Sequence, residues 1–214
     1  MMAFDSFFGP DESPEVLADG AMLLRGFART ETAQLLKSVE EITRLAPFRE
    51  MRTQGGLKMS LMSTGCGDLG WLNDNEGAVT GSYHIREQEL PPMPEIFLTF
   101  AKRAAEAAGY KAFRPNACLI NRYFPGAKLG LHQDRDESDL KAPIVSVSLG
   151  LPVNFLFGGV ERSDPKRRIP LDHGDVVVWG GASRMAFHGV LTVKEGSHPL
   201  LGRQRINLTF RKVS

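Results

Sequence analysis

Cysteine is scarce in this chain of 214 residues, which contains only Cys66 and Cys118. Two cysteines cannot form a disulfide framework, and neither belongs to a Cys-x-x-Cys pair, so zinc-finger and thioredoxin-like sites are excluded. Long apolar runs are absent too, because no window approaches the roughly 18 residues that a membrane span needs. The chain also lacks the basic start and apolar run of a signal peptide. We therefore expect a soluble, cytoplasmic protein with no membrane partner.

An excess of charge of one sign is also absent, since the formal net charge is only +1. The acidic residues are unevenly placed, however. Residues 1–20 contain five of them and no Lys or Arg, which leaves a net charge of +6 on the rest of the chain. We interpret residues 1–20 as an acidic N-terminal extension. A mildly basic body suits weak attraction to phosphate groups, although many ordinary enzymes are as basic.

Apolar residues are sufficient for one core, since 42% of the chain is hydrophobic. At this length such a content supports a single domain over residues 1–214. Residues 30–47 and 93–109 have the period of amphipathic helices, which Pro47 and Gly109 end. Between them, residues 48–90 alternate short β-like pieces with Gly, Asn and Asp turns. We interpret this stretch as an irregular, β-rich lid.

From Ala117 onward the hydrophobic period changes to two. Short strands separated by Gly, Pro and Asp turns are predicted in ACLINRYF, APIVSVSLGL, VNFLFGG, RIPLDHGDVVVWGG, RMAFHGV and INLTFR. This texture is typical of a sandwich or jelly roll. We therefore predict a mainly β fold with flanking helices (α+β), in which a jelly-roll core spans about residues 91–214.

The segment LHQDRDESDL, residues 131–140, combines a histidine with several carboxylates. On a strand, residues two apart point to one face at a spacing of roughly 6.6 Å, so His132 and Asp134 can face one metal ion. An isolated His-x-Asp is more often a polar turn. The pair therefore predicts a metal site only if other residues complete it.

The segment RINLTFR, residues 205–211, has one apolar and one polar face, and the polar face includes Arg205 and Arg211. If both faces were covered, the guanidinium groups would need an anionic partner, since unpaired buried charge is costly. A small dicarboxylate would serve, because arginine binds carboxylates through two parallel hydrogen bonds. An edge strand that shows its arginines to water remains the alternative. Asn121 and Tyr123 share a strand face and could add hydrogen bonds to the same ligand.

His188 lies between these segments, about 56 residues after His132 and 17 before Arg205. Two histidines and one carboxylate on one face of a metal leave three open positions, which is the arrangement of non-haem Fe(II) oxygenases. The remaining histidines fall in the lid or in turns, and we leave them outside the metal site: His84, His173 and His198. We expect Glu137 and Asp139 to be solvated turn residues.

Together these segments resemble the AlkB family of Fe(II)- and 2-oxoglutarate-dependent nucleic-acid dealkylases, from about Leu17 to Arg211. They look most similar to the family's bacterial founding member. The resemblance rests on ACLINRYFPGAKLGLHQDRDESDLKAPIVSVSLGLPVNFLFGG, HGDVVVWGG, FHGV and RINLTFR. It implies a double-stranded β-helix (jelly-roll) core preceded by a nucleotide-recognition lid.

The resemblance also implies residue roles. The iron ligands would be His132, Asp134 and His188. The residues that bind 2-oxoglutarate would be Asn121, Tyr123, Arg205, Asn207 and Arg211, and which arginine holds which carboxylate stays open.

On the substrate side, Trp71 matches the aromatic residue that stacks on the flipped base, with the His132 ring opposite it. Asp136 matches a carboxylate at the base edge, and Thr53 and Arg162 match positions near the substrate. A lid tyrosine of the founding member falls on Ala78 here. Tyr83 could compensate, but the lid's phosphate contacts, and so the preferred substrate length, do not carry over.

The implied activity is oxidative demethylation of N-alkylated bases such as 1-methyladenine and 3-methylcytosine. It uses Fe(II), 2-oxoglutarate and O2 and releases formaldehyde, succinate and CO2. The expected partners are alkylated single- or double-stranded DNA, with RNA as a further candidate, for a monomer in direct-reversal repair. Two alternatives stay open: the same chemistry on a protein side chain or metabolite, and a non-catalytic jelly-roll binding module. A base needs a stacking partner, so Trp71 and Asp136 weigh against the first, and a turnover assay separates the second.

Overall fold

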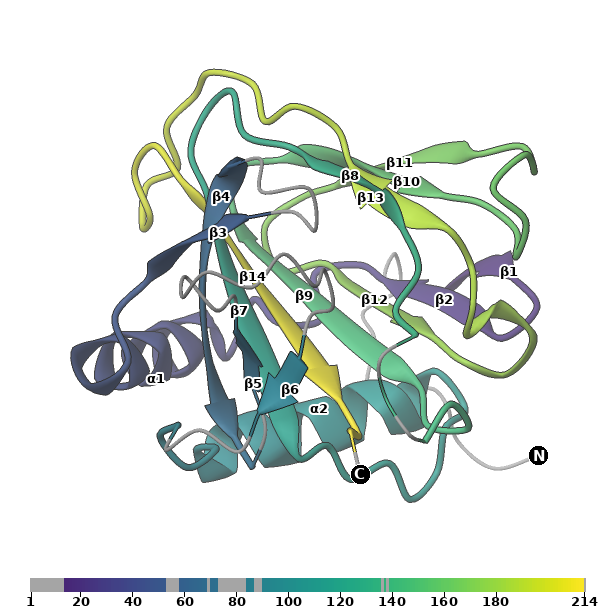
Figure 1. Ribbon diagram of the computed structural model, residues 1–214, viewed down its shortest axis with the longest axis horizontal. Helices are drawn as coiled ribbons and strands as arrows, with labels where there is room; N and C mark the ends of the chain where they lie inside the picture. Colours follow the sequence, from purple (N-terminus) through teal and green to yellow (C-terminus); the bar gives the residue numbers. More distant parts are fainter. Residues whose placement is uncertain are drawn as a thin grey trace.

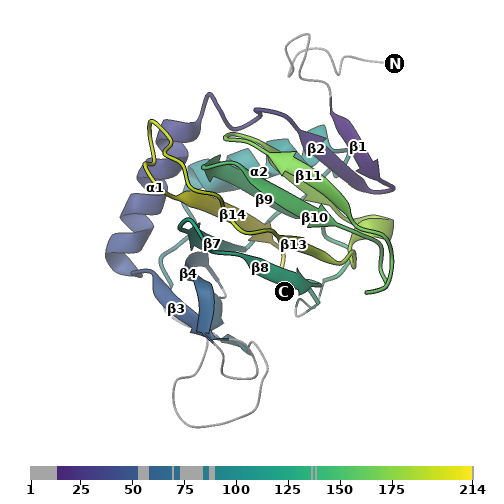
Figure 2. The same cartoon turned by 90° about the horizontal axis from the view of Figure 1, so that it is seen from above.

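The computed structural model describes residues 14–52, 58–68, 70–72, 84–86, 90–135, 137 and 139–213, with the backbone alone for residues 52, 70–72 and 84–86. Its strands form two facing sheets and a small separate ribbon (Figures 1 and 2). Both predicted helices and the mainly β fold are confirmed.

The larger sheet has eight strands in the order β1-β2-β12-β9-β14-β7-β4-β3. In that order the strands are β1 (Glu15–Ala18), β2 (Ala21–Leu24), β12 (Val176–Trp179), β9 (Ile144–Gly150), β14 (Arg205–Arg211), β7 (Ala117–Tyr123), β4 (Lys58–Gly67) and β3 (Arg49–Arg52). The smaller sheet has the order β11-β10-β13-β8. Its strands are β11 (Arg167–Leu171), β10 (Val153–Phe157), β13 (His188–Val190) and β8 (Leu129–His132). The ribbon pairs β5 (Gly70–Leu72) with β6 (His84–Arg86).

The chain winds back and forth between the two sheets. From β7 it passes to β8 in the smaller sheet, returns to β9, crosses to β10 and β11, and returns again to β12. It then crosses to β13 and ends in β14 of the larger sheet. This alternation between two antiparallel sheets is the winding of a jelly roll. Residues far apart in sequence therefore face one another across the space between the sheets.

Two helices, α1 (Thr32–Leu45) and α2 (Glu95–Ala107), cover the outer face of the larger sheet (Figure 1). Helix α1 ends two residues before Pro47, as predicted. After α2, Gly109 has φ +89°, a left-handed value that glycine adopts without strain at the end of a helix. Both helices bury one apolar stripe, formed in α1 by Leu35, Val39 and Ile42 and in α2 by Phe97, Phe100, Ala101, Ala104 and Ala105.

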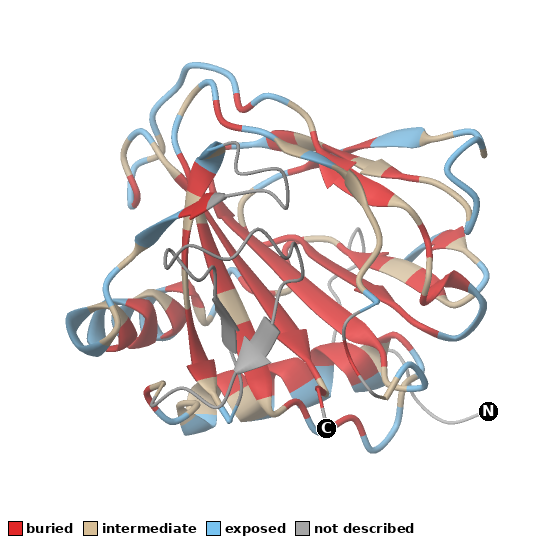
Figure 3. Ribbon diagram, viewed as in Figure 1, coloured by how far each residue is buried: buried red, intermediate tan, exposed pale blue. Residues whose placement is uncertain are grey.

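The final strand, β14, is buried along its whole length (Figure 3). Its even-numbered residues pack toward the helices, and Phe210 meets the ring of Phe97 edge to face at 5.4 Å between centroids. Its odd-numbered residues line the space between the sheets. The alternative of a solvent-facing edge strand is therefore wrong, since β14 lies between β9 and β7.

The segment predicted as a lid, residues 48–90, contributes β3 and β4 to the larger sheet and also contains the β5–β6 ribbon. Part of this segment thus forms a wall of the core. Both cysteines are free and buried. Among the residues that the structure describes, no helix is long and apolar enough to cross a membrane.

Candidate active site

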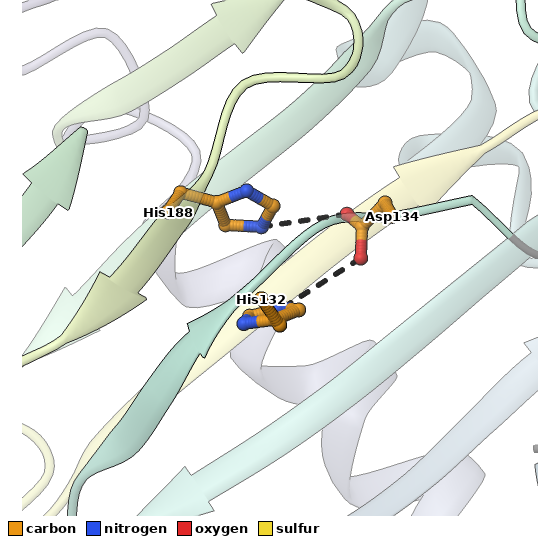
Figure 4. Close-up of side chains that lie close together, drawn as sticks. All are labelled: His132, Asp134 and His188. Carbon is orange, nitrogen blue, oxygen red and sulfur yellow. Dashed lines mark ion pairs between the residues drawn. The ribbon is translucent and has the colours of Figure 1, made fainter. Parts of the chain in front are cut away.

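Three potential metal ligands meet where the smaller sheet faces β14. His132 is the last residue of β8, and His188, the first of β13, is its register partner. Asp134 follows two residues after His132. Its carboxylate oxygens lie 3.7 Å from His132 Nε2 and 3.6 Å from His188 Nε2. Figure 4 shows the carboxylate turned toward both rings. The ligand atoms of all three residues lie within 4.8 Å of one another, so a single ion can contact all of them.

Both imidazole rings are turned in the way that metal binding requires. The Nδ1 atom of His132 lies 2.9 Å from the carbonyl oxygen of Gly130, and that of His188 lies 3.0 Å from the carbonyl oxygen of Ala186. Because a carbonyl only accepts, each Nδ1 carries the proton and donates. Each Nε2 then keeps its lone pair on the side of the carboxylate, and such an outer hydrogen bond is the usual support of a metal-bound histidine.

The electrostatic surroundings favour the protonation states that bind a cation. Burial, followed by the neighbouring His132, lowers the pKa of His188 to about 4, so this ring is neutral at physiological pH. Burial alone would raise the pKa of the Asp134 carboxyl, but the Arg211 guanidinium and the two histidines outweigh it and hold this pKa below its ordinary value. The result is a charged Asp134 carboxylate beside a neutral His188 imidazole.

A buried network of charges surrounds Asp134. Arg211 Nη2 donates to Asp134 Oδ2 at 2.8 Å, and Arg211 Nε lies 3.1 Å from Glu137 Oε1. The other carboxylate oxygen of Glu137 accepts from Arg184 Nη2 at 3.0 Å. The expectation that Glu137 is solvated is therefore wrong, because only 5% of this residue is exposed. Asp139 does lie in a turn, where it accepts a hydrogen bond from the backbone of Lys141.

Arg205, at the other end of β14, has quite different surroundings. It is 2% exposed, and its guanidinium lies 5.0 Å from the centroid of the Tyr123 ring. Nη2 donates to Ser148 Oγ at 2.9 Å, whereas Nε and Nη1 have no hydrogen-bond partner among the described residues. Burial lowers the pKa of this guanidinium and raises that of Tyr123, whose buried hydroxyl also has no partner in the described parts of the chain. This end of the site is suited to an anion, and none of the described residues supplies one.

Two amide side chains lie between these ends, and hydroxyl groups fix their orientation. Ser63 Oγ donates to Asn121 Oδ1 at 2.5 Å across the β4–β7 pair, which leaves the amide nitrogen of Asn121 as its donor group. Asn207 Nδ2 donates to Ser146 Oγ and to the Val147 carbonyl, both at 2.9 Å. Its Oδ1 accepts from Thr209 at 3.0 Å. Sequence reasoning missed Ser63, because a lone serine in a presumed lid gave no signal.

A cavity of about 540 Å³ joins these groups between the two sheets. It is lined by every predicted site residue whose side chain is described: Asn121, Tyr123, His132, Asp134, Arg162, His188, Arg205, Asn207 and Arg211. Arg162 lies at the exposed rim and donates to the Leu131 carbonyl at 3.1 Å. Apolar side chains that include Met51, Met59 and Leu131 complete the lining. The volume of the cavity is sufficient for a small dicarboxylate and a further flat group.

The remaining residues singled out from the sequence lie outside the cavity or outside the residues that the structure describes. Trp71 lies on β5, but its side chain is outside the described part. Thr53, Ala78, Tyr83 and Asp136 lie outside the described residues altogether. His173 and His198 stack on each other, with centroids 4.3 Å apart, and do not line the cavity. His84 is placed only as part of β6.

These residues fit both a metal ion and an organic anion. Two imidazoles and a carboxylate on one side of an ion suit Fe(II) and leave open positions for other ligands. Three groups are donors placed for a carboxylate: the Asn121 amide, the Tyr123 hydroxyl and the Arg205 nitrogens that have no hydrogen-bond partner among the described residues. The arrangement can therefore hold a metal and a dicarboxylate next to each other.

Comparison with known proteins agrees with this geometry. Residues 20–211 match the family described as the 2OG-Fe(II) oxygenase superfamily. The chain is 51% identical over 209 residues to the alpha-ketoglutarate-dependent dioxygenase AlkB of Escherichia coli, covering 97% of each chain. It is 28% identical over 241 residues to the tRNA demethylase abh1 of Schizosaccharomyces pombe, covering 92% of this chain and 80% of that protein. The solved structure of OsALKBH1 has a TM-score of 0.79 and 28% identity, covering 93% of this chain and 99% of that one.

Proposed function

Because this chain belongs to the AlkB family within the 2OG-Fe(II) oxygenase superfamily, we propose that it oxidatively demethylates N-alkylated bases in nucleic acids. The protein is an Fe(II)- and 2-oxoglutarate-dependent dioxygenase that also uses O2. One observation carries the proposal: three metal ligands line the same cavity as Arg205, a buried arginine with no carboxylate partner among the described residues.

The described side chains divide the work along the cavity. His132, Asp134 and His188 would hold Fe(II). The carboxylate of 2-oxoglutarate farther from the metal would lie on Arg205, at the end of β14 opposite to the Asp134 contact. Tyr123 and the amide nitrogen of Asn121 would add hydrogen bonds to the co-substrate. Asn207 and Arg211, which line the cavity from β14, would contact it and fix its position.

When bound, the metal, 2-oxoglutarate and O2 together supply oxidation of an N-methyl carbon, with release of succinate, CO2 and finally formaldehyde. The protein holds each reactant in place and excludes water from the cavity. Burial of Arg205 and of the Asp134 carboxylate strengthens the attraction of each for its ligand, because charges interact more strongly away from water.

On the substrate side, residues of the segment 48–90 would form the nucleotide-recognition lid. A methyl group on the pairing edge is reachable only if the base leaves the helix, and a flipped base needs flat groups to stack on. We assign this role to Trp71, opposite the ring of His132, which is about one third exposed at the cavity. Asp136 would lie at the base edge, and Thr53 and Arg162 would lie near the rest of the nucleotide.

A carboxylate at the base edge favours positively charged lesions. Methylation at N1 of adenine or N3 of cytosine leaves a cationic base, whereas 1-methylguanine and 3-methylthymine are neutral. The substrate that we propose is therefore alkylated single- or double-stranded DNA, and RNA of the same chemistry, handled by a monomer in the cytoplasm.

The test is mass spectrometry of oligonucleotides that carry one methylated base, incubated with the protein, Fe(II), ascorbate and 2-oxoglutarate. Loss of 14 mass units (roughly one CH2) from cationic lesions, with matching formaldehyde, is the expected result. Co-substrate turnover without any change in DNA or RNA lesions would instead point to a protein or metabolite substrate. No turnover at all would leave a binding module.

A further inference from the structure

Arg184 is a buried arginine located four residues before His188, and it holds the segment that follows Asp134. Its Nη1 donates to the Asp134 carbonyl at 2.6 Å, and its Nε donates to the Ala142 carbonyl at 3.0 Å. Its Nη2 donates to the Glu137 carboxylate at 3.0 Å. One guanidinium thus holds the two ends and the middle of the stretch from Asp134 to Ala142, in which the described residues belong to no helix or strand.

Glu137 connects this arginine to the metal ligand. Its second oxygen lies 3.1 Å from Arg211 Nε, and Arg211 Nη2 binds the Asp134 carboxylate at 2.8 Å. Asp134 is therefore held from two sides, through its backbone carbonyl by Arg184 and through its carboxylate by Arg211. Glu137 joins the two arginines.

This arrangement does more than fill space. Two arginines and two carboxylates balance in charge, and all four side chains are less than one tenth exposed. Buried ion pairs of this kind are often replaceable by apolar residues without loss of stability, so stability alone does not account for them. What apolar residues cannot supply is a fixed direction for the Asp134 side chain and hydrogen bonds that hold the backbone at Asp134 and Ala142.

We infer that Arg184 and Glu137 are positioning residues: they set the geometry of the Asp134 ligand and of the described backbone next to it, at Asp134 and Arg135, which borders the substrate cavity. The part that concerns the metal depends only on the ligand set. The part that concerns the substrate rests on the proposed function.

Metal affinity tests the first part without any turnover. Outer partners of metal ligands typically contribute roughly 10–100-fold to affinity. Arg184→Gln should therefore bind Mn(II) about tenfold more weakly than the parent in anaerobic calorimetry. Arg184→Lys should recover part of the loss, since its single ammonium can reach some but not all of the three acceptors. Unchanged Mn(II) affinity in Arg184→Gln would overturn the inference.

The chain offers a matched control. Arg25 also joins a buried carboxylate and a carbonyl, since Nη1 donates to Asp175 Oδ2 at 2.8 Å and to the Pro170 carbonyl at 2.7 Å. None of these residues lines the cavity. Arg25→Gln should lower the melting temperature but leave Mn(II) affinity unchanged. An equal loss of affinity in both variants would show that Arg184 acts only through stability.

The part that concerns the substrate is tested by how tightly decarboxylation of 2-oxoglutarate, measured as succinate, is coupled to demethylation of the base, measured as formaldehyde. In Glu137→Gln, which keeps the shape but removes the charge, we expect several-fold more succinate per formaldehyde than in the parent. The ratio is compared with the succinate that the same variant forms without oligonucleotide at saturating Fe(II), so that weaker metal binding is not counted as uncoupling. If Mn(II) affinity falls but the succinate-to-formaldehyde ratio stays that of the parent, the role on the substrate side is refuted. If no methylated oligonucleotide reacts even with the parent, the proposed function fails while the metal result stands.

Discussion

The two ends of β14 carry the same residue type on the same face, yet they differ in how the charge is balanced. Arg211 contacts two carboxylates of its own chain, those of Asp134 and Glu137. Arg205 contacts the Ser148 hydroxyl and Tyr123 but no carboxylate among the described side chains. A buried guanidinium that is paired with carboxylates of its own chain has a structural role, whereas one without an anion indicates a binding site for an anionic ligand. Among the described residues, the charge of Arg211 is thus balanced by carboxylates, whereas the charge of Arg205 is left for the co-substrate to balance.

Removing a ligand at the metal end should have the largest effect. We expect His132→Ala, Asp134→Ala and His188→Ala each to abolish succinate formation. The loss of activity should exceed the roughly 10–100-fold loss that follows removal of an outer partner of a metal ligand. Asp134→Ala also deprives Arg211 of one carboxylate, so it should lose the most stability. Succinate release and thermal melting measure the two effects.

His198→Ala is the control for this series, because His198 lies outside the cavity. It should retain parental turnover. Substantial iron-dependent turnover in all three ligand variants would refute the metal assignment.

At the other end, Arg205→Lys keeps the charge but loses the planar fork. Charge-assisted hydrogen bonds contribute about 1.5–3 kcal/mol, so the KM for 2-oxoglutarate should rise by roughly 10–100-fold. Steady-state kinetics with varied 2-oxoglutarate measures it. Arg203→Lys, two residues away and exposed beside Glu195, should leave this KM unchanged. A parental KM in Arg205→Lys would place the carboxylate elsewhere.

Trp71→Ala should affect neither end of β14. We expect weaker binding of methylated oligonucleotides by about 1–3 kcal/mol, the usual value of a base–aromatic stack. Turnover of 2-oxoglutarate in the absence of DNA should persist, since this reaction needs no base. If DNA-independent turnover fell in parallel with oligonucleotide binding, Trp71 would be a core residue and not a stacking partner.

The smallest effect should come from Ser63→Ala. The Asn121 amide then loses the hydroxyl that fixes its orientation, so affinity for 2-oxoglutarate should drop by roughly 2–10-fold, the value of one neutral hydrogen bond. Calorimetry with Mn(II)-loaded protein measures this change. Ser60→Ala is the control on the same strand, because the Ser60 hydroxyl hydrogen-bonds the exposed backbone of Lys128 and does not line the cavity. Equal affinities in parent and Ser63→Ala would show that Asn121 does not need this support.

Much of the site could be predicted from sequence because it follows simple periods. The alternation in RINLTFR separates apolar from polar residues, and the jelly roll covers both faces of that strand as expected. The sequence expectation that His132 and Asp134 share a strand is only half met, because β8 ends at His132 and Asp134 lies beyond it, held by Arg211. His188 is the register partner of His132 in the smaller sheet.

Other features depend on contacts that no local pattern encodes. Glu137 looks like a solvated turn residue because its burial arises from Arg184 and Arg211, which are distant in sequence. Ser63 meets Asn121 only through the register of β4 against β7, and a shift of one residue would turn Ser63 to the opposite face. The interpretation of residues 48–90 as a lid could not show that β4 is a strand of the main sheet, since irregular composition hides its pairing with β7.

The central claim is that Arg205 is reserved for the carboxylate of 2-oxoglutarate that lies farther from the metal. Its most direct test is anaerobic calorimetry that compares 2-oxoglutarate with 2-oxobutyrate, which lacks that carboxylate, on Mn(II)-loaded parent and Arg205→Gln. The parent should bind 2-oxoglutarate at least about tenfold more tightly than 2-oxobutyrate. Arg205→Gln should lose most of this preference by weakening 2-oxoglutarate alone. A preference that persists unchanged in Arg205→Gln would contradict the claim.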